Sequence, residues 1–239
     1  MARIRDHQAL TFDVYGTLID WEPSIVASFT AWARRNGVTA GGEDFLDAFD
    51  QARAGLQSLR PALPYPEVLR RAYASVVGRW NHPVASRDQE EFAASIRTWP
   101  PYPDAVASLE HLRRHFRMAC VSNIDDRSLA DTLAGLGVDW DFTVTAERVG
   151  AYKPDFPHFV HMIWHCGRLG VTPDRILHVG QSLRADVAPA AKLGLRTAWI
   201  NRQGRRLGVN NPGADRAGAD FVFSSLADLV EAHEDELRS

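Results

Sequence analysis

The chain has 239 residues, of which 45% are hydrophobic and 24% are charged, with 27 basic against 30 acidic side chains. This ordinary globular composition excludes a disordered, collagen-like or coiled-coil protein. With a formal net charge of −3, the chain lacks the excess of basic residues that is typical of nucleic-acid-binding proteins, so we expect no nucleic-acid partner. No run approaches the ~20 apolar residues that a membrane span needs, and no signal-peptide pattern follows the first residues. We therefore expect a cytoplasmic protein with no membrane partner and with free thiols at Cys120 and Cys166.

Short apolar runs alternate with helix-length segments through most of the chain. The predicted strands are residues 9–15, 118–123, 142–146, 176–180, 196–201 and 220–223. The predicted helices between and after these strands are residues 104–115, 127–136, 156–169, 185–193 and 226–236. Continuous apolar strands separated by helices are typical of a parallel sheet that is covered on both faces. The pattern therefore predicts an α/β, doubly wound parallel-sheet fold.

The segment from residue 21 to residue 99 interrupts this alternation, because it has helical spacing and no candidate strand. The predicted helices in it are residues 23–36, 43–59, 66–80 and 87–98, and prolines punctuate its middle and its end. We interpret it as an inserted all-helical cap domain at 21–99, with a core domain made of 1–20 and 100–239. The alternative is a set of surface helices belonging to one domain. The Gly-rich stretch 204–218 is expected to be an exposed loop.

Polar side chains follow four of the predicted strands, and the carboxyl ends of parallel strands meet at one edge of a sheet. They are Asp13, Tyr15, Thr17, Ser122, Asn123, Lys153, Ser182 and Asp186. An aspartate inside an apolar run is costly unless it is satisfied or used, so Asp13 is a candidate carboxylate nucleophile. Lys153 could supply the compensating positive charge. Each residue also has an ordinary structural interpretation, as a turn, a solvated lysine or a helix cap.

Four segments resemble, in order, the four signatures of the haloacid dehalogenase superfamily. They are residues 12–18, 121–123, 152–154 and 179–186. The resemblance covers nearly the whole predicted core. It implies an α/β core domain of this family, and the helical insertion fits the family's cap domain.

Two positions separate the subgroups of this superfamily. In its phosphatases a second aspartate, two residues after the nucleophile, protonates the leaving alcohol, but this chain has Tyr15 there. A Gly-Asp pair in the fourth signature supplies a magnesium ligand in those enzymes, but this chain has Gly180-Gln181. Magnesium favours carboxylates. The chain therefore resembles the type II L-2-haloacid dehalogenases, which need no metal or other cofactor. A halide leaving group needs no proton, so dehalogenation does not require the general acid that this chain lacks.

The resemblance implies roles for particular residues. The expected catalytic residues are Asp13, Thr17, Ser122, Asn123, Lys153 and Asp186, and the expected substrate-binding residues are Val14, Tyr15, Arg53 and Ser182, with no metal ligands. Asp13 would attack the halogen-bearing carbon of a small anionic 2-haloacid, and water would hydrolyse the resulting ester.

Two departures from the dehalogenase pattern keep alternatives open. Asp50 aligns with their cap arginine, with Arg53 one turn later, and Leu183 replaces their asparagine in the fourth signature. The alternatives are a Mg²⁺-dependent phosphatase or phosphotransferase and a catalytically weak binding protein. The prediction allows a homodimer.

The remaining histidines and tryptophans have plainer interpretations. His178 is predicted to be a packed core residue. His158, His161 and His165 are predicted to lie on a half-exposed helix face, and no histidine spacing indicates a metal site. Trp21, at the entrance of the insertion, could line a pocket or fill the hinge.

Overall fold

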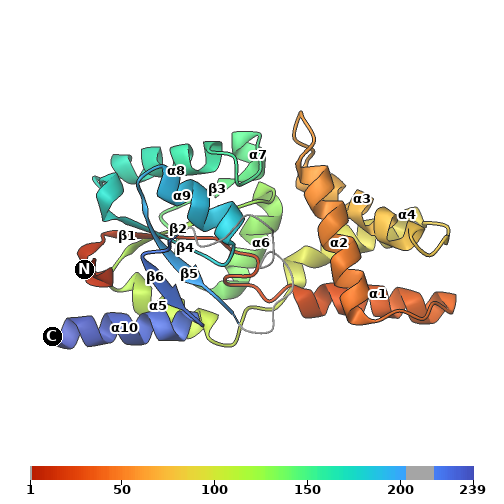
Figure 1. Cartoon of the computed structure of the whole chain (residues 1–239), viewed down its shortest axis with the longest axis horizontal. Coiled ribbons are helices and arrows are strands. Elements are labelled where there is room, and N and C mark those ends of the chain that lie inside the picture. The colour runs from red at the N-terminus through yellow and green to blue at the C-terminus, as the bar shows by residue number, and fades with distance from the viewer. Residues whose placement is uncertain (1, 203–217) are drawn as a thin grey trace.

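The computed structural model describes residues 2–202 and 218–239. Its centre is a six-stranded sheet with every strand pair parallel, in the order β3-β2-β1-β4-β5-β6 (Figure 1). The strands are β1 (Ala9–Phe12), β2 (Arg117–Ser122), β3 (Phe142–Thr145), β4 (Ile176–Gly180), β5 (Arg196–Ile200) and β6 (Phe221–Phe223). This confirms the predicted α/β fold, with all six strands present.

The first strand is shorter than predicted. It ends at Phe12, because the Val14 carbonyl accepts the backbone N–H groups of Thr17, Leu18 and Ile19 and the chain turns there. Gly16 has φ 99°, a conformation that favours glycine. The tight turn places Asp13 and Thr17 next to each other beyond the strand end.

Helices cover both faces of the sheet. On one face α5 (Ala105–Arg113), α6 (Asp126–Leu136) and α10 (Leu226–Arg238) pack in one core cluster with Leu10 and Phe12 of β1. On the other face α8 (Pro157–Arg168) and α9 (Ala188–Lys192) share a second cluster with β-strand residues that point the opposite way. Side chains of β1, β2 and β4 therefore enter both clusters, which explains the continuous apolar runs of these strands in the sequence. The short α7 (Ala146–Val149) follows β3, and 3-10 turns cover Ile4–Asp6, Ile96–Thr98 and Pro173–Arg175.

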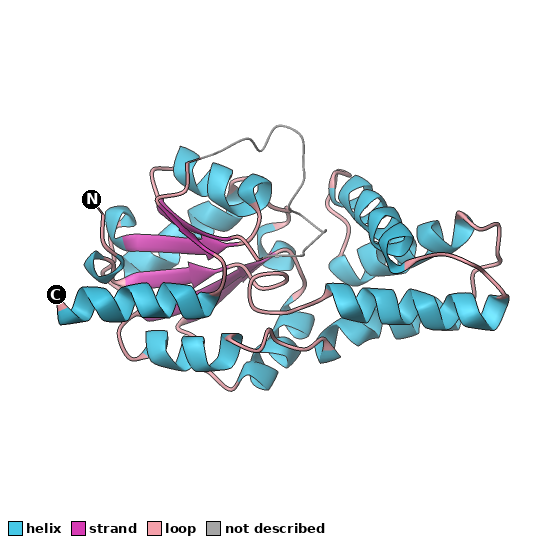
Figure 2. Ribbon diagram, turned by 60° about the horizontal axis from the view of Figure 1, so that its bottom comes forward, coloured by secondary structure: helices cyan, strands magenta, loops and turns pink. Residues whose placement is uncertain are grey.

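Residues 21–99, all of which the structure describes, contain helices and no strand. The helices are α1 (Glu22–Asn36), α2 (Gly42–Gln57), α3 (Tyr65–Gly78) and α4 (Ser86–Ser95). Figure 2 shows them as a bundle beside the sheet domain. Phe29 stacks on Phe45 and Tyr73, with ring centroids 5.6 Å and 5.3 Å apart, and forms the centre of this bundle.

One predicted helix is divided in two. The segment predicted as residues 185–193 is a π-helical turn at Leu183–Val187 followed by α9. Pro189 lacks an N–H group and cannot donate to the carbonyl four residues earlier, so a regular α-helix cannot run through this point. Wider turns of this kind are common at functional sites, and this one carries Asp186.

Two expectations from composition can be compared with the structure. Cys120 and Cys166 are free and buried, as predicted. None of the described helices is long and apolar enough to cross a bilayer. The predicted loop at 204–218 lies outside the described residues except for Gly218.

Candidate active site

Asp13 lies directly after β1, at the carboxyl edge of the sheet, and is only 8% exposed. The Thr17 hydroxyl donates a hydrogen bond to its Oδ2 at 2.7 Å, and Lys153 Nζ donates to its Oδ1 at 2.9 Å. The backbone N–H of Gln181 donates a hydrogen bond to Thr17 Oγ1 at 3.0 Å, so the Thr17 hydroxyl proton is directed at Asp13. Both carboxylate oxygens of Asp13 are therefore held in fixed positions.

Lys153 connects three elements at this edge. It is 3% exposed, and besides Asp13 its Nζ donates to Asp186 Oδ1 and to the Val121 carbonyl, each at 2.7 Å. An ammonium group has three N–H donors, and these three acceptors account for all of them. Lys153, which the sequence analysis offered as the charge that compensates Asp13, forms ion pairs with both Asp13 and Asp186.

Asn123 positions the main chain of Lys153. Its Oδ1 accepts the Lys153 amide at 2.7 Å, and its Nδ2 donates to the Lys153 carbonyl at 3.1 Å. This side chain therefore fixes the loop that delivers the ammonium group. The neighbouring Ser122 ends β2, is 1% exposed and lines the same cavity as Asp13.

Asp186 is held from three sides. Besides the ion pair with Lys153, its Oδ2 accepts the Ser182 amide at 3.1 Å, and His178 Nε2 lies 3.7 Å from its Oδ1. A Cβ atom at Gly180 would lie 2.6 Å from the Asp186 Cβ, so no larger residue fits at that position. The glycine of the fourth signature thus lets the carboxylate approach the end of β4.

The two carboxylates that share Lys153 differ in proton affinity. Burial and the negative charge of Asp186 raise the pKa of Asp13, and the opposing effects of Lys153 and Thr17 do not cancel this. Burial would also raise the pKa of Asp186, but Lys153 and His178 outweigh it and lower that pKa to about 2. Burial lowers the pKa of Lys153, but the two carboxylates outweigh it and raise it. The ammonium group therefore stays charged, with Asp186 as its firmly ionised partner.

A cavity of about 60 Å³ opens between this sheet edge and helices α2 and α3. One water needs roughly 10–15 Å³ by this measure, so the space suits a ligand of a few heavy atoms. The side chains lining it that come from the sheet domain include Asp13, Ser122, Asn123, Lys153, Ser182 and Asp186. Those from the insertion and its hinge are Trp21, Asp50, Arg53, Ala54, Gln57 and Tyr65. Trp21 therefore lines the pocket.

Tyr15 lines the cavity, but its hydroxyl is engaged elsewhere. The hydroxyl shares a 2.7 Å hydrogen bond with Thr132 Oγ1, and the ring packs edge-on against Trp99. Burial is the main cause that raises the Tyr15 pKa. The Val14 side chain, by contrast, is fully buried in the core and does not line the cavity, so a contact of Val14 with a substrate would have to come from its backbone. Thr17 is also fully buried behind the cavity, and its side chain contacts two residues that line it, Asp13 and Gln181.

Arg53 reaches the cavity from α2. Its guanidinium forms an ion pair with Asp50 and donates to Gln57 Oε1 at 3.1 Å, and it lies over the Trp21 ring with 5.1 Å to the centroid. Arg53 therefore lines the cavity with its charge balanced by Asp50.

Sequence reasoning missed Arg184. This side chain lines the cavity next to Ser182, and within residues 2–202 and 218–239 its buried Nε has no hydrogen-bond partner and the guanidinium forms no ion pair. Burial and the neighbouring charge of Arg53 lower the pKa of Arg184. Its position beside a signature residue was the available signal, but the family pattern assigns that position no role.

Gln181 was considered only as a missing metal ligand. It is 6% exposed and lines the cavity, and its Oε1 is buried without a hydrogen-bond partner among the described residues. A buried acceptor without a protein partner is a place for an ordered water. Leu183, which replaces the dehalogenase asparagine, is not among the residues lining the cavity.

Two histidine predictions need comment. His178 is fully buried, as predicted, but it also contacts the site, because its Nδ1 lies 2.9 Å from Thr11 Oγ1 and its Nε2 faces Asp186. His158 is fully buried and bonded to the Ser122 carbonyl at 3.2 Å, so its prediction as half-exposed is wrong. His161 and His165, on the outer side of α8, fit that prediction.

A protein-family model for haloacid dehalogenase-like hydrolases matches residues 7–194. The chain belongs to this family of hydrolases. A mouse haloacid dehalogenase-like hydrolase domain-containing protein 3 is 30% identical over 97% of this chain and 96% of its own length. An (S)-2-haloacid dehalogenase 4A of Burkholderia cepacia is 25% identical over 93% of both chains. Phosphatases also match, among them a phosphoserine phosphatase of Thermus thermophilus that is 32% identical over 74% of this chain and 70% of its own.

The fold has close counterparts among solved structures. The L-2-haloacid dehalogenase of Xanthobacter autotrophicus with covalently bound chloropropionic acid superposes with a TM-score of 0.76, covering 94% of this chain and 97% of the other. The two are 23% identical, so this likeness shows a shared fold.

Proposed function

We propose that this hydrolase releases halide from a small 2-haloalkanoic acid through an ester on Asp13 and without a metal ion. The observation that carries the proposal is the position two residues after Asp13. A phosphatase needs a proton donor there for its leaving alcohol, but this chain has Tyr15, whose hydroxyl is engaged with Thr132. A halide leaves without a proton, so the site lacks nothing that this reaction needs.

In the first step an Asp13 carboxylate oxygen attacks the carbon that bears the halogen. The new C–O bond forms as the carbon–halogen bond breaks, and halide leaves with the bonding electron pair. Thr17 and Lys153 hold the carboxylate in one orientation, which lowers the entropy cost of reaching the reactive geometry. The relative from Burkholderia cepacia, named as an (S)-2-haloacid dehalogenase, supports this substrate class.

In the second step water attacks the ester carbonyl of Asp13. The acyl C–O bond breaks, and the 2-hydroxy acid leaves with one proton of the water on its hydroxyl oxygen. The other proton is released, so that Asp13 returns to its carboxylate form. Lys153 Nζ, at hydrogen-bond distance from Asp13 Oδ1, would stabilise negative charge that develops on that oxygen. Gln181 Oε1, which has no hydrogen-bond partner among the described residues, would position the water in place of the asparagine that Leu183 replaces.

The substrate carboxylate needs a positive partner inside the cavity. Lys153 already serves two carboxylates, and Arg53 is paired with Asp50. Arg184 has no such partner among the described residues, and a guanidinium can bind a carboxylate through two parallel hydrogen bonds. We therefore assign substrate anchoring to Arg184, with the Ser122 hydroxyl as a further donor.

The donor set suits an organic anion better than Mg²⁺. All four carboxylate oxygens of Asp13 and Asp186 already accept hydrogen bonds from the protein. The next position, Gln181, offers a neutral amide where a third carboxylate would strengthen a magnesium site.

A second candidate is a Mg²⁺-dependent phosphatase or phosphotransferase. It is favoured by the adjacent carboxylates of Asp13 and Asp186 and by the phosphatases among the relatives. In that function the two carboxylates and the Tyr15 carbonyl would hold the ion, which would neutralise phosphate charge. A catalytically weak binding protein is the remaining alternative, and it predicts no turnover at all.

The test is halide release from L-2-chloropropionate and from haloacetates in the presence of EDTA, with Asp13→Asn as the matched control. We expect release by the wild type and none above background by the variant. Hydrolysis of p-nitrophenyl phosphate only after Mg²⁺ addition, with no halide release from any haloacid, would replace the proposal by the phosphatase. Identical wild-type and variant results on both panels would favour the binding protein.

A further inference from the structure

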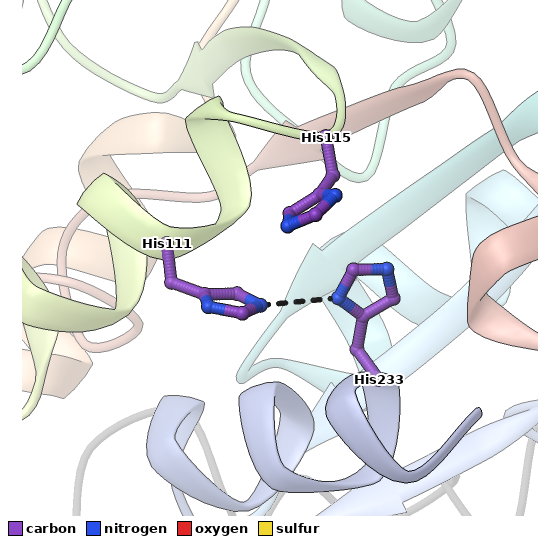
Figure 3. Close-up of side chains that lie close together, drawn as sticks. All are labelled: His111, His115 and His233. Carbon is purple, nitrogen blue, oxygen red and sulfur yellow. Dashed lines mark hydrogen bonds between the residues drawn. The ribbon is translucent and has the colours of Figure 1, made fainter. Parts of the chain in front are cut away.

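Three histidines, from α5, from the turn that follows it and from α10, meet at the end of the sheet domain that lies opposite the active site. His111 belongs to α5 and His115 follows it, two residues before β2 begins at Arg117, whereas Asp13 follows the other end of β1. His233 belongs to α10, which packs against α5. Figure 3 shows the three rings converging on one space between these helices. The cluster is thus separate from the candidate active site.

The spacing of residues along the two segments helps to explain why these rings meet. His111 and His115 are four residues apart and therefore lie on one side of their segment. His233 lies seven residues after Leu226 and four after Leu229, so it occupies the inward face of α10, and it is 1% exposed. A separation of 122 residues between His111 and His233 hides the cluster from any local spacing rule.

The geometry matches what a metal ion needs. One ring nitrogen from each histidine lies within 4.8 Å of the others, and His111 Nε2 lies 3.2 Å from His233 Nδ1. Two ligands at about 2.0–2.1 Å from a tetrahedral zinc ion lie roughly 3.3 Å apart. The pair is therefore close to ligand spacing, and the exposed His115 ring can rotate inward as the third ligand.

Two charged side chains lie beside His111, of which one would support metal binding and the other competes for the same ring nitrogen. Glu234 Oε1 lies 3.5 Å from His111 Nδ1, the nitrogen that faces away from His233, and such a carboxylate commonly orients a metal-bound imidazole. Arg114 Nη2 lies 3.3 Å from the same nitrogen and would turn away when that nitrogen carries the proton. On metal binding, the hydrogen bond between His111 Nε2 and His233 Nδ1 would be replaced by a bond from each of these nitrogens to the ion, with both imidazoles neutral.

We propose that His111, His115 and His233 bind one divalent transition-metal ion of the class that prefers imidazole, with zinc as the probe. The ion would join α10, the last helix of the chain, to α5. Because His115 is exposed, a fourth coordination position would be open to water. The site would serve stability of the sheet domain and leave the chemistry at Asp13 unchanged.

The test uses the full chain stripped with EDTA and then desalted, titrated with zinc by calorimetry at neutral pH. His115→Gln removes the exposed ligand without disturbing the buried ring, and His161→Gln is the matched control on the outer side of α8. We expect one zinc ion per chain, affinity lower by at least about tenfold in His115→Gln, and no change in His161→Gln. Zinc should also raise the thermal midpoint of the wild type and of His161→Gln only.

Two results would overturn the site. One is a wild type that binds no zinc at concentrations well above that of the protein. The other is a His115→Gln variant that binds zinc as tightly as the wild type, which would move any binding elsewhere. If His115→Gln were poorly folded, cobalt bound to the wild type would decide. Visible absorption bands of tetrahedral strength support the cluster, and weak octahedral bands contradict it.

Discussion

Lys153 Nζ lies 2.9 Å from Asp13 Oδ1, although the two residues are 140 positions apart in the sequence. The ammonium group has no contact with bulk water of any consequence, since its side chain is 1% exposed. It is therefore a fixed charge whose three donors all serve the carboxylate site and its supporting strand. Asp13 gains both its orientation and part of its charge balance from this one contact.

Replacing Lys153 should impair catalysis and folding together. We expect Lys153→Ala to raise KM and lower kcat, with a loss of at least ~100-fold in kcat/KM, or ~2.7 kcal/mol of transition-state stabilisation. The variant also leaves two buried carboxylates without a cation, which costs about 3–5 kcal/mol of folding stability. Lys153→Arg should restore little, because a planar guanidinium does not fit a site built for a compact ammonium. Steady-state halide release and denaturant unfolding measure the two effects. Native turnover by a folded alanine variant would remove Lys153 from the site.

Asp13→Asn should separate activity from stability. Because the folded environment raises the pKa of Asp13, its ionised form is less favourable in the folded than in the unfolded chain. Removing that charge should leave the thermal midpoint at neutral pH unchanged or higher, while halide release falls at least about 1000-fold, or ~4 kcal/mol. Thermal unfolding and halide assays on one preparation provide the check. A markedly lower midpoint would mean that Asp13 serves mainly to stabilise the fold.

As the pH is lowered, kcat/KM should fall at a pH above the pKa of an ordinary aspartate, which is about 3.9. We call this fall the acidic limb. Asp13 must be ionised to attack, and its pKa is raised, so activity is lost early as the pH falls. Asp186→Asn should move the limb to lower pH in the residual activity, because it removes a charge that raises the Asp13 pKa. A limb that stays in place in this variant would contradict the coupling between the two carboxylates.

Arg184→Gln should weaken substrate binding more than chemistry. With the Arg184 guanidinium removed, we expect KM for a 2-haloacid to rise about tenfold or more, with a smaller fall in kcat, and Arg184→Lys to recover part of the loss. Arg87→Gln, at an exposed position on α4, controls for the change in net charge. Equal KM values in Arg184→Gln and the wild type would show that the substrate carboxylate binds elsewhere.

Gln181→Leu should slow the second step more than the first. Without the unpartnered amide oxygen the hydrolytic water loses its partner, so the ester on Asp13 should accumulate. Mass spectrometry of the intact chain, quenched during turnover, would detect the added mass of the carboxyalkyl group that the substrate contributes. A variant that turns over normally, with no accumulated adduct, would assign the water to another residue.

The sequence predicted the parts of this molecule that depend on local patterns. Six apolar runs became six parallel strands, and the rule that strand ends share an edge brought Asp13, Ser122 and Lys153 together. The predicted ends of the strands were less accurate. The turn after Phe12 depends on hydrogen bonds to one backbone carbonyl, and residue propensities do not reveal such bonds. The domain boundaries at residues 21 and 99 remain a prediction.

What could not be predicted were contacts set by the final packing. Arg184 lines the cavity from a π-helical turn, which the spacing of residues 185–193 did not predict. His158 is buried because its ring bonds the Ser122 carbonyl, although its helix looked half-exposed by spacing. The cluster of His111, His115 and His233 depends on how α10 packs on α5. Each of these contacts forms only when segments that are far apart in the sequence come together in the folded chain.

The most direct test of the central claim is a single turnover of L-2-chloropropionate in water enriched in oxygen-18, with enzyme in excess. If Asp13 forms the ester and water attacks its carbonyl, the label must appear first in the Asp13 carboxylate. Mass spectrometry of the peptide containing Asp13 should then show a gain of one heavy oxygen, and the first product should be unlabelled. Label in the hydroxyl of the first product, with none in the peptide, would mean that water attacks the substrate directly and would contradict the account.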